Sequence, residues 1–199
     1  MSRKSKFIYT DIDLDGAMSY LLMMWFNNNK HIPYISSKVT DFNKSFAKWL
    51  SYHKPSKYSN IYILDLDISQ DSISMVDLDN VVIIDHHTTH VNNKHKYTKA
   101  KHFIKEETSC CKHIYNLLHK QSDVQLTDQQ KHLLLLVDDY DCYKLQLQGS
   151  HDLNLLFWNY QGDRVAKFIT EFKDGFHGFT DDQLSIIKFY KKAIQETIS

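Results

Sequence analysis

Short apolar runs alternate with amphipathic segments along the first half of the chain. Runs rich in β-branched and aromatic residues are FIYT (7–10), IPYISS (32–37), NIYILD (60–65) and NVVIID (80–85). Between them, apolar residues repeat at three- and four-residue steps in 17–25 and in 41–52, which predicts amphipathic helices. Strands that alternate with helices indicate a parallel sheet with crossover helices. Because each predicted strand is nearly all apolar, we expect helices on both of its faces, as in a doubly wound α/β fold.

After residue 105 the pattern becomes helical and remains so. We expect four helices there, one of them over 109–120. Two others begin at capping boxes, in which a threonine is followed three residues later by a glutamine: Thr127 with Gln130, and Thr180 with Gln183. The parallel sheet is therefore predicted to be followed by a helical C-terminal segment.

One break divides this helical part. The segment KDGFHGF (173–179) carries two of the five glycines of the chain. We therefore place a boundary there, between a catalytic core over 1–175 and a terminal helix within 176–199 that packs on the core or extends from it. The aromatic-rich LNLLFWNYQ (153–161) is interpreted as part of the core.

Length and composition limit the remaining choices. A chain of 199 residues fits one domain. Its 24 basic and 24 acidic residues give no net charge, so an anionic partner must be held by a local patch or by a metal. Three cysteines match neither a disulfide framework nor paired zinc ligands, and no glycine-rich nucleotide loop occurs. With no signal peptide and no apolar run near the roughly 20 residues of a membrane span, we expect a cytoplasmic protein without membrane contact.

Four groups of acidic residues stand at the ends of predicted elements. Three follow strands: TDIDLDG (10–16), Asp65 after NIYIL, and DHH (85–87). The fourth, LVDDYDCY (136–143), ends an apolar helix. Because the carboxyl ends of parallel strands line one crevice, we expect these groups to converge there.

Crowded carboxylates need a cation. Like charges a few ångströms apart raise each other's pKa and cannot all stay ionised. Oxygen ligands with one imidazole suit Mn²⁺ or Mg²⁺, and a ligand set too large for one ion suggests two ions that share a bridging carboxylate and activate a water. Gly16 would allow the tight turn that such a site requires.

Each group alone also has a simpler interpretation. The pattern DxDxDG fits a calcium loop or an acidic turn, although the downstream glutamate of an EF-hand is missing. Asp65 alone fits a helix N-cap, and a histidine pair alone fits an exposed surface. The occurrence of all four at element ends favours a shared metal site.

These motifs resemble those of the DHH phosphoesterase superfamily. Its members include RecJ-type single-strand nucleases, oligoribonucleases, cyclic dinucleotide phosphodiesterases and manganese-dependent pyrophosphatases. TDIDLDG is similar to the first motif, YILDLDIS to the second, IIDHHTT to the third and LVDDYDCY to the fourth, so the resemblance runs from about residue 7 to about residue 145.

The resemblance implies a set of metal ligands. Two metal ions, Mn²⁺ or alternatively Mg²⁺, would be held as follows: one by Asp11 and Asp13, the other by Asp15, His86 and Asp139, with Asp65 bridging them. The implied reaction is the in-line attack of a metal-bridged hydroxide on phosphorus.

Other roles follow from the same resemblance. His87 would contact the scissile phosphate, and Asp85 would support the histidines through hydrogen bonds. In the fourth motif Asp138, Asp139 and Asp141 are alternatives; the family's spacing to a following aromatic residue favours Asp139.

The implied activity is that of a phosphodiesterase acting on single-stranded nucleic acid or short oligonucleotides. Most family members carry a second domain with a glycine-rich motif that clamps the substrate, and nothing like it occurs here. An open site, a homodimer or a protein partner would then replace it. Two alternatives are a pyrophosphatase or other small-phosphate hydrolase, and a non-catalytic replication scaffold; the latter is disfavoured because every expected ligand position holds Asp or His.

A basic stretch after the DHH triplet offers candidate substrate contacts. Lysines with interleaved aromatic residues can hold phosphates and stack bases: Lys94, Lys96 and Lys99 with Tyr97 and Phe103. In the alternative interpretation, Phe103 belongs to a strand and the lysines form a solvated edge.

Overall fold

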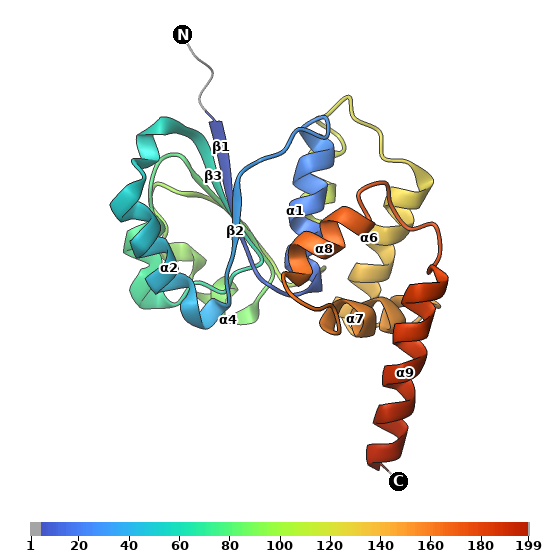
Figure 1. The fold of residues 1–199 in the computed structure, drawn as a ribbon. Coiled ribbons are helices and arrows are strands. Elements are labelled where there is room, and N and C mark those ends of the chain that lie inside the picture. Colours follow the sequence, from blue (N-terminus) through green and yellow to red (C-terminus); the bar gives the residue numbers. More distant parts are fainter. Residues whose placement is uncertain (1–4, 199) are drawn as a thin grey trace.

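The computed structural model describes residues 5–198 and contains a five-stranded sheet with helices on both faces (Figure 1). All neighbouring strands are parallel, in the order β2-β1-β3-β4-β5. Their bounds are β1 Ser5–Thr10, β2 Tyr34–Ser36, β3 Tyr58–Leu64, β4 Val81–Asp85 and β5 Lys101–Ile104. The predicted α/β class and the four predicted strands are confirmed, and the sheet gains β5 as an edge strand.

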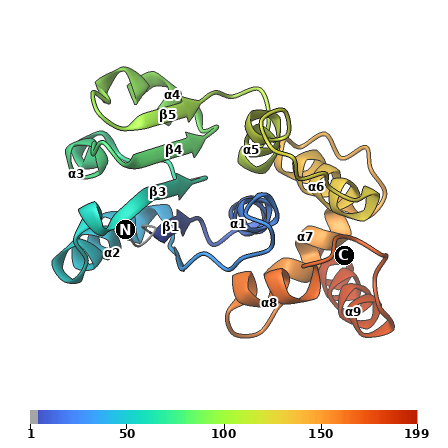
Figure 2. The ribbon, with the colours of Figure 1, turned by 90° about the horizontal axis from the view of Figure 1, so that it is seen from above.

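Helices lie on both faces of the sheet. Figure 2 shows α1 and α5 on one side and α2, α3 and α4 on the other. The bounds are α1 Leu14–Phe26, α2 Val39–Tyr52, α3 Ile73–Val76, α4 Thr88–Asn93 and α5 Cys110–Leu118, with short 3-10 turns at Pro55–Lys57, Gln70–Ser72 and Lys94–Lys96. Within β4, Ile84 packs in the core beside α1 and α5, whereas its neighbour Ile83 packs in the core beside α2 and α3. Burial on both faces explains why the strand segments are almost entirely apolar.

The chain leaves the neighbouring strands β1 and β3 in opposite directions. After β1 it enters α1, which packs on one face; after β3 it enters α3, which packs on the other. The strand order therefore reverses between β1 and β3, and such a switch point opens a crevice at the carboxyl ends of the strands. The first two acidic groups lie there.

Four further helices follow α5 along the chain. They are α6 Asp128–Asp141, α7 Ser150–Trp158, α8 Arg164–Glu171 and α9 Asp181–Ile198. With α5 this makes five among the described residues, one more than predicted, because a turn containing Gly162 at φ +80° separates two short helices. Both predicted capping boxes are present, at Thr127 before α6 and at Thr180 before α9.

The segment 173–179 is packed on the core. The indole N–H of Trp25 donates to the carbonyl of Lys173 at 2.7 Å, and the N–H of Phe176 donates to the carbonyl of Gln129 at 3.0 Å. Beyond it, α9 buries Ile187 near its start and projects away from the body of the molecule (Figure 1). The helix both packs and extends; the division into two units stays a prediction. In the described chain, no helix combines the length and the apolar character needed to span a membrane.

Candidate metal centre

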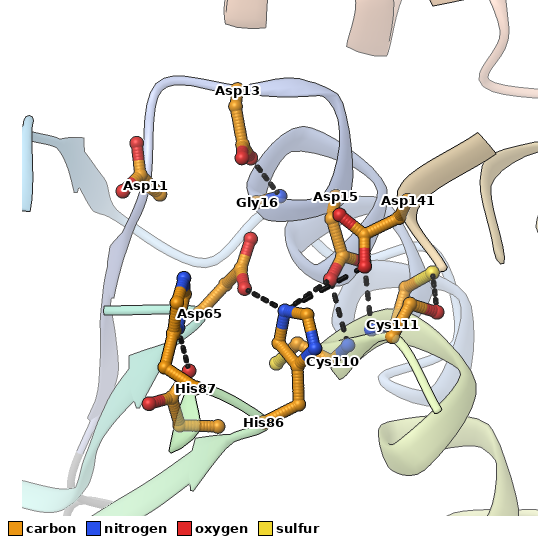
Figure 3. Close-up of polar contacts among 12 residues, drawn as sticks. Asp11, Asp13, Asp15, Gly16, Asp65, His86, His87, Cys110, Cys111 and Asp141 are labelled. Atoms are coloured by element: carbon orange, nitrogen blue, oxygen red, sulfur yellow. Dashed lines mark hydrogen bonds and ion pairs between the residues drawn. The ribbon is translucent and has the colours of Figure 1, made fainter. Parts of the chain in front are cut away.

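Four side chains from four separate segments meet at the carboxyl ends of the strands. Nε2 of His86, just after β4, lies 3.2 Å from Oδ1 of Asp65, which follows β3. The same nitrogen lies 3.6 Å from Oδ2 of Asp15 in α1 and 3.6 Å from Oδ2 of Asp141 at the end of α6 (Figure 3). One imidazole N–H cannot serve three carboxylates. Carboxylates and an imidazole gathered around one point form a ligand set for a divalent cation.

Asp65 shows the need for a partner most clearly. Its side chain is 1% exposed, and neither of its carboxylate oxygens has a hydrogen bond within the described chain. Its φ of +57° lies in the left-handed region that residues other than glycine seldom adopt. Residues with such strained backbone conformations often occur at functional sites. The N-cap interpretation is wrong, because the next helical turn begins only at Gln70 and follows Ser69. Both oxygens of Asp65 are thus available to a cation.

Asp15 is held in place by the start of α5. Its carboxylate accepts the backbone N–H groups of Cys110 at 2.7 Å and Cys111 at 2.9 Å. The positive end of the α5 dipole therefore offsets part of its charge. Burial nevertheless raises the pKa of Asp15, with His86 acting in the opposite direction.

Charge repulsion is visible in the pKa values of the other acids. Burial raises the pKa of Asp11 to about 7, and neighbouring Asp13 adds to the shift. Burial likewise raises the pKa of Asp141 to about 8, assisted by the nearby charge of Asp15. The pKa of Asp65 is raised well above its usual value by burial and then by Asp15. A divalent cation bound among these groups would offset the cost of burying their charges together.

The structure does not bring Asp11 and Asp13 into the same cluster. Asp13 is the N-cap of α1, and its Oδ1 accepts the N–H of Gly16 at 2.8 Å. The carboxylate of Asp11 turns back onto the N–H of Ile12. Among the described residues, the closely spaced ligand groups at this site draw on Asp15, Asp65, His86, His87 and Asp141. Asp11 and Asp13, predicted to hold the first ion, thus border the cluster. Asp15 and His86, two of the three ligands predicted for the second ion, lie within it.

Three aspartates in the fourth acidic group have three different partners. Asp139 is buried and accepts the N–H groups of Gln146 at 3.0 Å and Leu147 at 3.1 Å, so it fixes the loop after α6. Asp138 accepts the hydroxyl of Ser109 at 2.8 Å and ties α6 to α5. Only Asp141 of the three faces His86. This geometry favours Asp141 over the predicted Asp139 as the ligand from this group.

Asp85 lies beneath the histidines but contacts only one of the two in the DHH motif. Its oxygens pair with Nδ1 of His87 at 2.7 Å and with Nδ1 of His90 at 2.6 Å, and Nε2 of His90 meets the hydroxyl of Tyr97 at 2.6 Å. Burial lowers the pKa of His87, but the hydrogen bond to Asp85 outweighs it and raises that pKa to about 9. His90 is fully buried in this chain of contacts.

The candidate substrate lysines are spread over the molecule. Nζ of Lys94 donates to the carbonyl of Ile104 at the end of β5, at 3.3 Å. Nζ of Lys96 donates to the side chain of Asn93 at 3.0 Å. Lys99 precedes β5 and lines a hollow at the amino ends of the strands, on the opposite edge of the sheet from the cluster. Only Lys94 therefore stands near the carboxyl-terminal edge. Tyr97 is buried and cannot stack on a base, whereas Phe103 is 40% exposed.

Gly16 allows the acidic loop to lie against α1. A Cβ at this position would lie 2.5 Å from the carbonyl oxygen of Asp11 and 2.9 Å from its nitrogen, both rigid backbone atoms. We expect Gly16→Ala to displace the loop, to lower the free energy of unfolding by about 1–3 kcal/mol, and to weaken metal binding. Urea unfolding and Mn²⁺ titration measure these effects. Gly162→Ala is the control for metal binding: no atom would lie within 4 Å of the added Cβ, although the φ of +80° strains the alanine backbone. Metal binding should be unchanged in this variant, and equal weakening in both variants would contradict the expectation.

The crowded acids also predict how stability depends on pH. Because the pKa values of Asp11 and Asp141 are raised to about 7 and about 8, the folded state holds their protons more tightly than the unfolded state does. Their stabilising contribution is complete below about pH 4 and is lost as the pH rises through 7 and 8. The raised pKa of His87 acts in the same direction, and the lowered pKa of Asp85 has its effect below this range. Thermal unfolding in chelator should therefore show a midpoint that falls from pH 4 to 8.

Excess Mn²⁺ should remove this decline, since the ion replaces the protons. The Asp141→Asn variant in chelator should show a flatter profile than the wild-type protein. A wild-type midpoint that rises over the same range would contradict the expected repulsion.

Comparison with known proteins relates the chain to a family and to solved structures. The model of the DHH family, N-terminal domain, matches residues 5–137, and none of the curated proteins matches the chain. Among solved structures, an uncharacterized protein from Helicobacter pylori G27 is 18% identical, with a TM-score of 0.57 over 84% of this chain and 50% of that chain. CDC45 from Entamoeba histolytica is 11% identical, with a TM-score of 0.39 over 96% of this chain and 34% of that one.

At such identities the Helicobacter pylori structure shows similarity of fold alone, and the present chain spans half the length of that protein. The family match is the stronger finding. It covers more than half of the chain and includes the DxDxDG loop, Asp65 and the DHH triplet. The chain therefore belongs to the DHH family of phosphoesterases.

Proposed function

We propose that the protein is a metal-dependent phosphodiesterase that hydrolyses single-stranded nucleic acid or short oligonucleotides. Membership of the DHH family indicates the metal-dependent phosphoesterase class. The observation that carries the proposal is the buried carboxylate of Asp65, which accepts no hydrogen bond from the described residues and lies among Asp15, His86 and Asp141.

The donor set fits Mn²⁺ or Mg²⁺. Three carboxylates and one imidazole are ligands that these ions accept, and a cation would satisfy the orphaned oxygens of Asp65 and Asp141. Asp15, His86 and Asp141 would hold one ion, Asp11 and Asp13 a second, and Asp65, with two free oxygens, could contact both. When bound, two such ions supply an activated water and offset the charge that develops on the phosphoryl group.

His87 is the group of this chain best placed to bind the scissile phosphate. Its Nδ1 is engaged by Asp85, which leaves Nε2 to face the crevice from a side chain that is 38% exposed. With its pKa raised to about 9, the imidazole is protonated at neutral pH and donates a hydrogen bond to a phosphate oxygen. The hydrogen bonds from Asp85 to His90 and from His90 to Tyr97 hold the Asp85 carboxylate, which in turn orients the His87 ring.

An open crevice favours a flexible substrate. Two hollows beside the acids are lined by side chains from α1, α2, α6, α7 and α8, and a single strand could lay its phosphate against the cluster there. Lys94, beside the end of β5, is a candidate contact for a more distant phosphate. A homodimer or a protein partner would extend this open site.

The test is a panel of end-labelled substrates incubated with Mn²⁺: single-stranded DNA and RNA, dinucleotides, cyclic dinucleotides, and pyrophosphate. We expect release of nucleotides that stops in excess chelator. Phosphate release from pyrophosphate without cleavage of any nucleotide would replace the proposal by a pyrophosphatase. Tight metal binding without hydrolysis of any substrate would replace it by a non-catalytic scaffold.

A further inference from the structure

An exposed tryptophan and an arginine stand together beside the acidic cluster. Trp158 ends α7 and Arg164 begins α8, and the guanidinium carbon lies 4.5 Å from the centre of the indole ring. Trp158 is 45% exposed, whereas Trp25 and Trp49 are buried in the two cores. Arg164 is the only arginine in the described part of the chain. The pair is thus chemically distinct from the lysine-rich remainder of the surface.

The pair forms one wall of a groove that leads into the cluster. The groove, of about 500 Å³, is lined by Asp11, Asp13, Lys38, Thr40, Trp158 and Arg164. A smaller hollow of about 150 Å³ shares Asp13 and Trp158 with the groove and is also lined by Asp15 and Asp141. A ligand in the groove would therefore touch Trp158 and the candidate metal ligands together.

The charges of this groove are arranged for a ligand that carries phosphates. Its lining combines the carboxylates of Asp11 and Asp13 with two cations, Lys38 and Arg164. Neither cation forms a salt bridge with an acid among the residues that the structure describes. The indole offers a flat surface on which a base can stack. The adjacent guanidinium can bind a phosphate group or contact the π system of the base.

We propose that Trp158, Arg164 and Lys38 form a nucleotide subsite next to the metal centre. The base of one nucleotide stacks on Trp158, and Arg164 and Lys38 hold the backbone phosphate beside the scissile one. This inference rests on the proposed function and makes it specific: helices α7 and α8 supply the substrate clamp, and the ligand is single-stranded nucleic acid rather than a small inorganic phosphate.

Tryptophan fluorescence tests the binding step without turnover. Trp158 is the one exposed tryptophan, so its emission should be quenched when a single-stranded thymidine oligomer with phosphorothioate linkages is added in Mg²⁺. Pyrophosphate should leave the emission unchanged, and the Trp158→Phe variant should show no quenching with the oligomer. Equal quenching in Trp158→Phe and wild type, or none in the wild type, would overturn the subsite.

Steady-state kinetics test its role in hydrolysis. Trp158→Ala and Arg164→Ala should each raise the KM for an oligonucleotide about tenfold with little change in kcat. Trp158→Phe and Arg164→Lys should recover part of the loss. The matched controls are Phe189→Ala on α9 and Lys131→Ala on α6, an exposed aromatic residue and an exposed lysine away from the groove.

The two proposals can fail separately. Hydrolysis with an unchanged KM in both alanine variants, or the same rise in the controls, would reject the subsite and leave the phosphodiesterase standing. Quenching of Trp158 by the oligomer in a protein that cleaves nothing would reject the phosphodiesterase and retain the subsite.

Discussion

The Asp65→Asn variant should lose metal-dependent hydrolysis by roughly 10³-fold or more while keeping its fold. The amide has nearly the shape of the carboxylate but lacks its charge, so it cannot bridge cations. The substitution also removes a buried acid whose pKa is raised by burial and by the neighbouring charge of Asp15. The free energy of unfolding in chelator should therefore be unchanged or higher. Steady-state assays and thermal unfolding on the same preparation separate the two effects.

Asp71→Asn is the matched control for this variant. Asp71 lies on the same segment after β3, is exposed, and belongs to the 3-10 turn rather than to the cluster. Its activity should equal that of the wild-type protein. Manganese-dependent turnover that survives in Asp65→Asn would remove Asp65 from the proposed bridging role.

Asp141→Asn and Asp139→Asn should behave in opposite ways. Asp141 faces His86 and has an unpartnered buried oxygen, so its loss should reduce hydrolysis about 10²-fold or more with no loss of stability in chelator. Asp139 instead accepts two backbone N–H groups from the loop after α6. Its replacement should lower the free energy of unfolding by about 1 kcal/mol for the donor left unpaired, with activity within a few-fold of wild type.

Mn²⁺ titration adds a readout independent of activity. Affinity should fall in Asp141→Asn and stay unchanged in Asp139→Asn. The reverse pattern, with metal binding lost only in Asp139→Asn, would restore the choice that the sequence spacing favoured.

The sheet was predictable because its central strands are buried on both faces. Two-sided burial makes each strand an apolar run, and the capping boxes at Thr127 and Thr180 are local signals that tertiary contacts do not alter. Strand β5 lies at the sheet edge and alternates exposed and covered residues, and it confirms the alternative interpretation in which Phe103 belongs to a strand. Helices α7 and α8 are short and are separated by the turn that contains Gly162.

The location of the site was predictable from the sequence, but the full set of residues that form it was not. Acidic groups after parallel strands must share one edge, which places Asp15, Asp65 and His86 together. The choice among the aspartates at the end of α6 depends on how that helix is rotated against α5 and on the following loop. Two further features arise from packing between segments and could not be predicted from sequence spacing. They are the contact of His90 with Tyr97 and the approach of Trp158 to Asp13.

Binding of Mn²⁺ to the purified protein tests most directly whether the acidic cluster is a divalent-cation site. Electron paramagnetic resonance of free Mn²⁺, measured during titration of wild-type protein and of Asp65→Asn, counts the ions bound to each. We expect up to two ions per wild-type chain and weakened binding in the variant. A wild-type protein that binds no Mn²⁺ at millimolar concentration, or a variant that binds as well as the wild type, would contradict the metal centre.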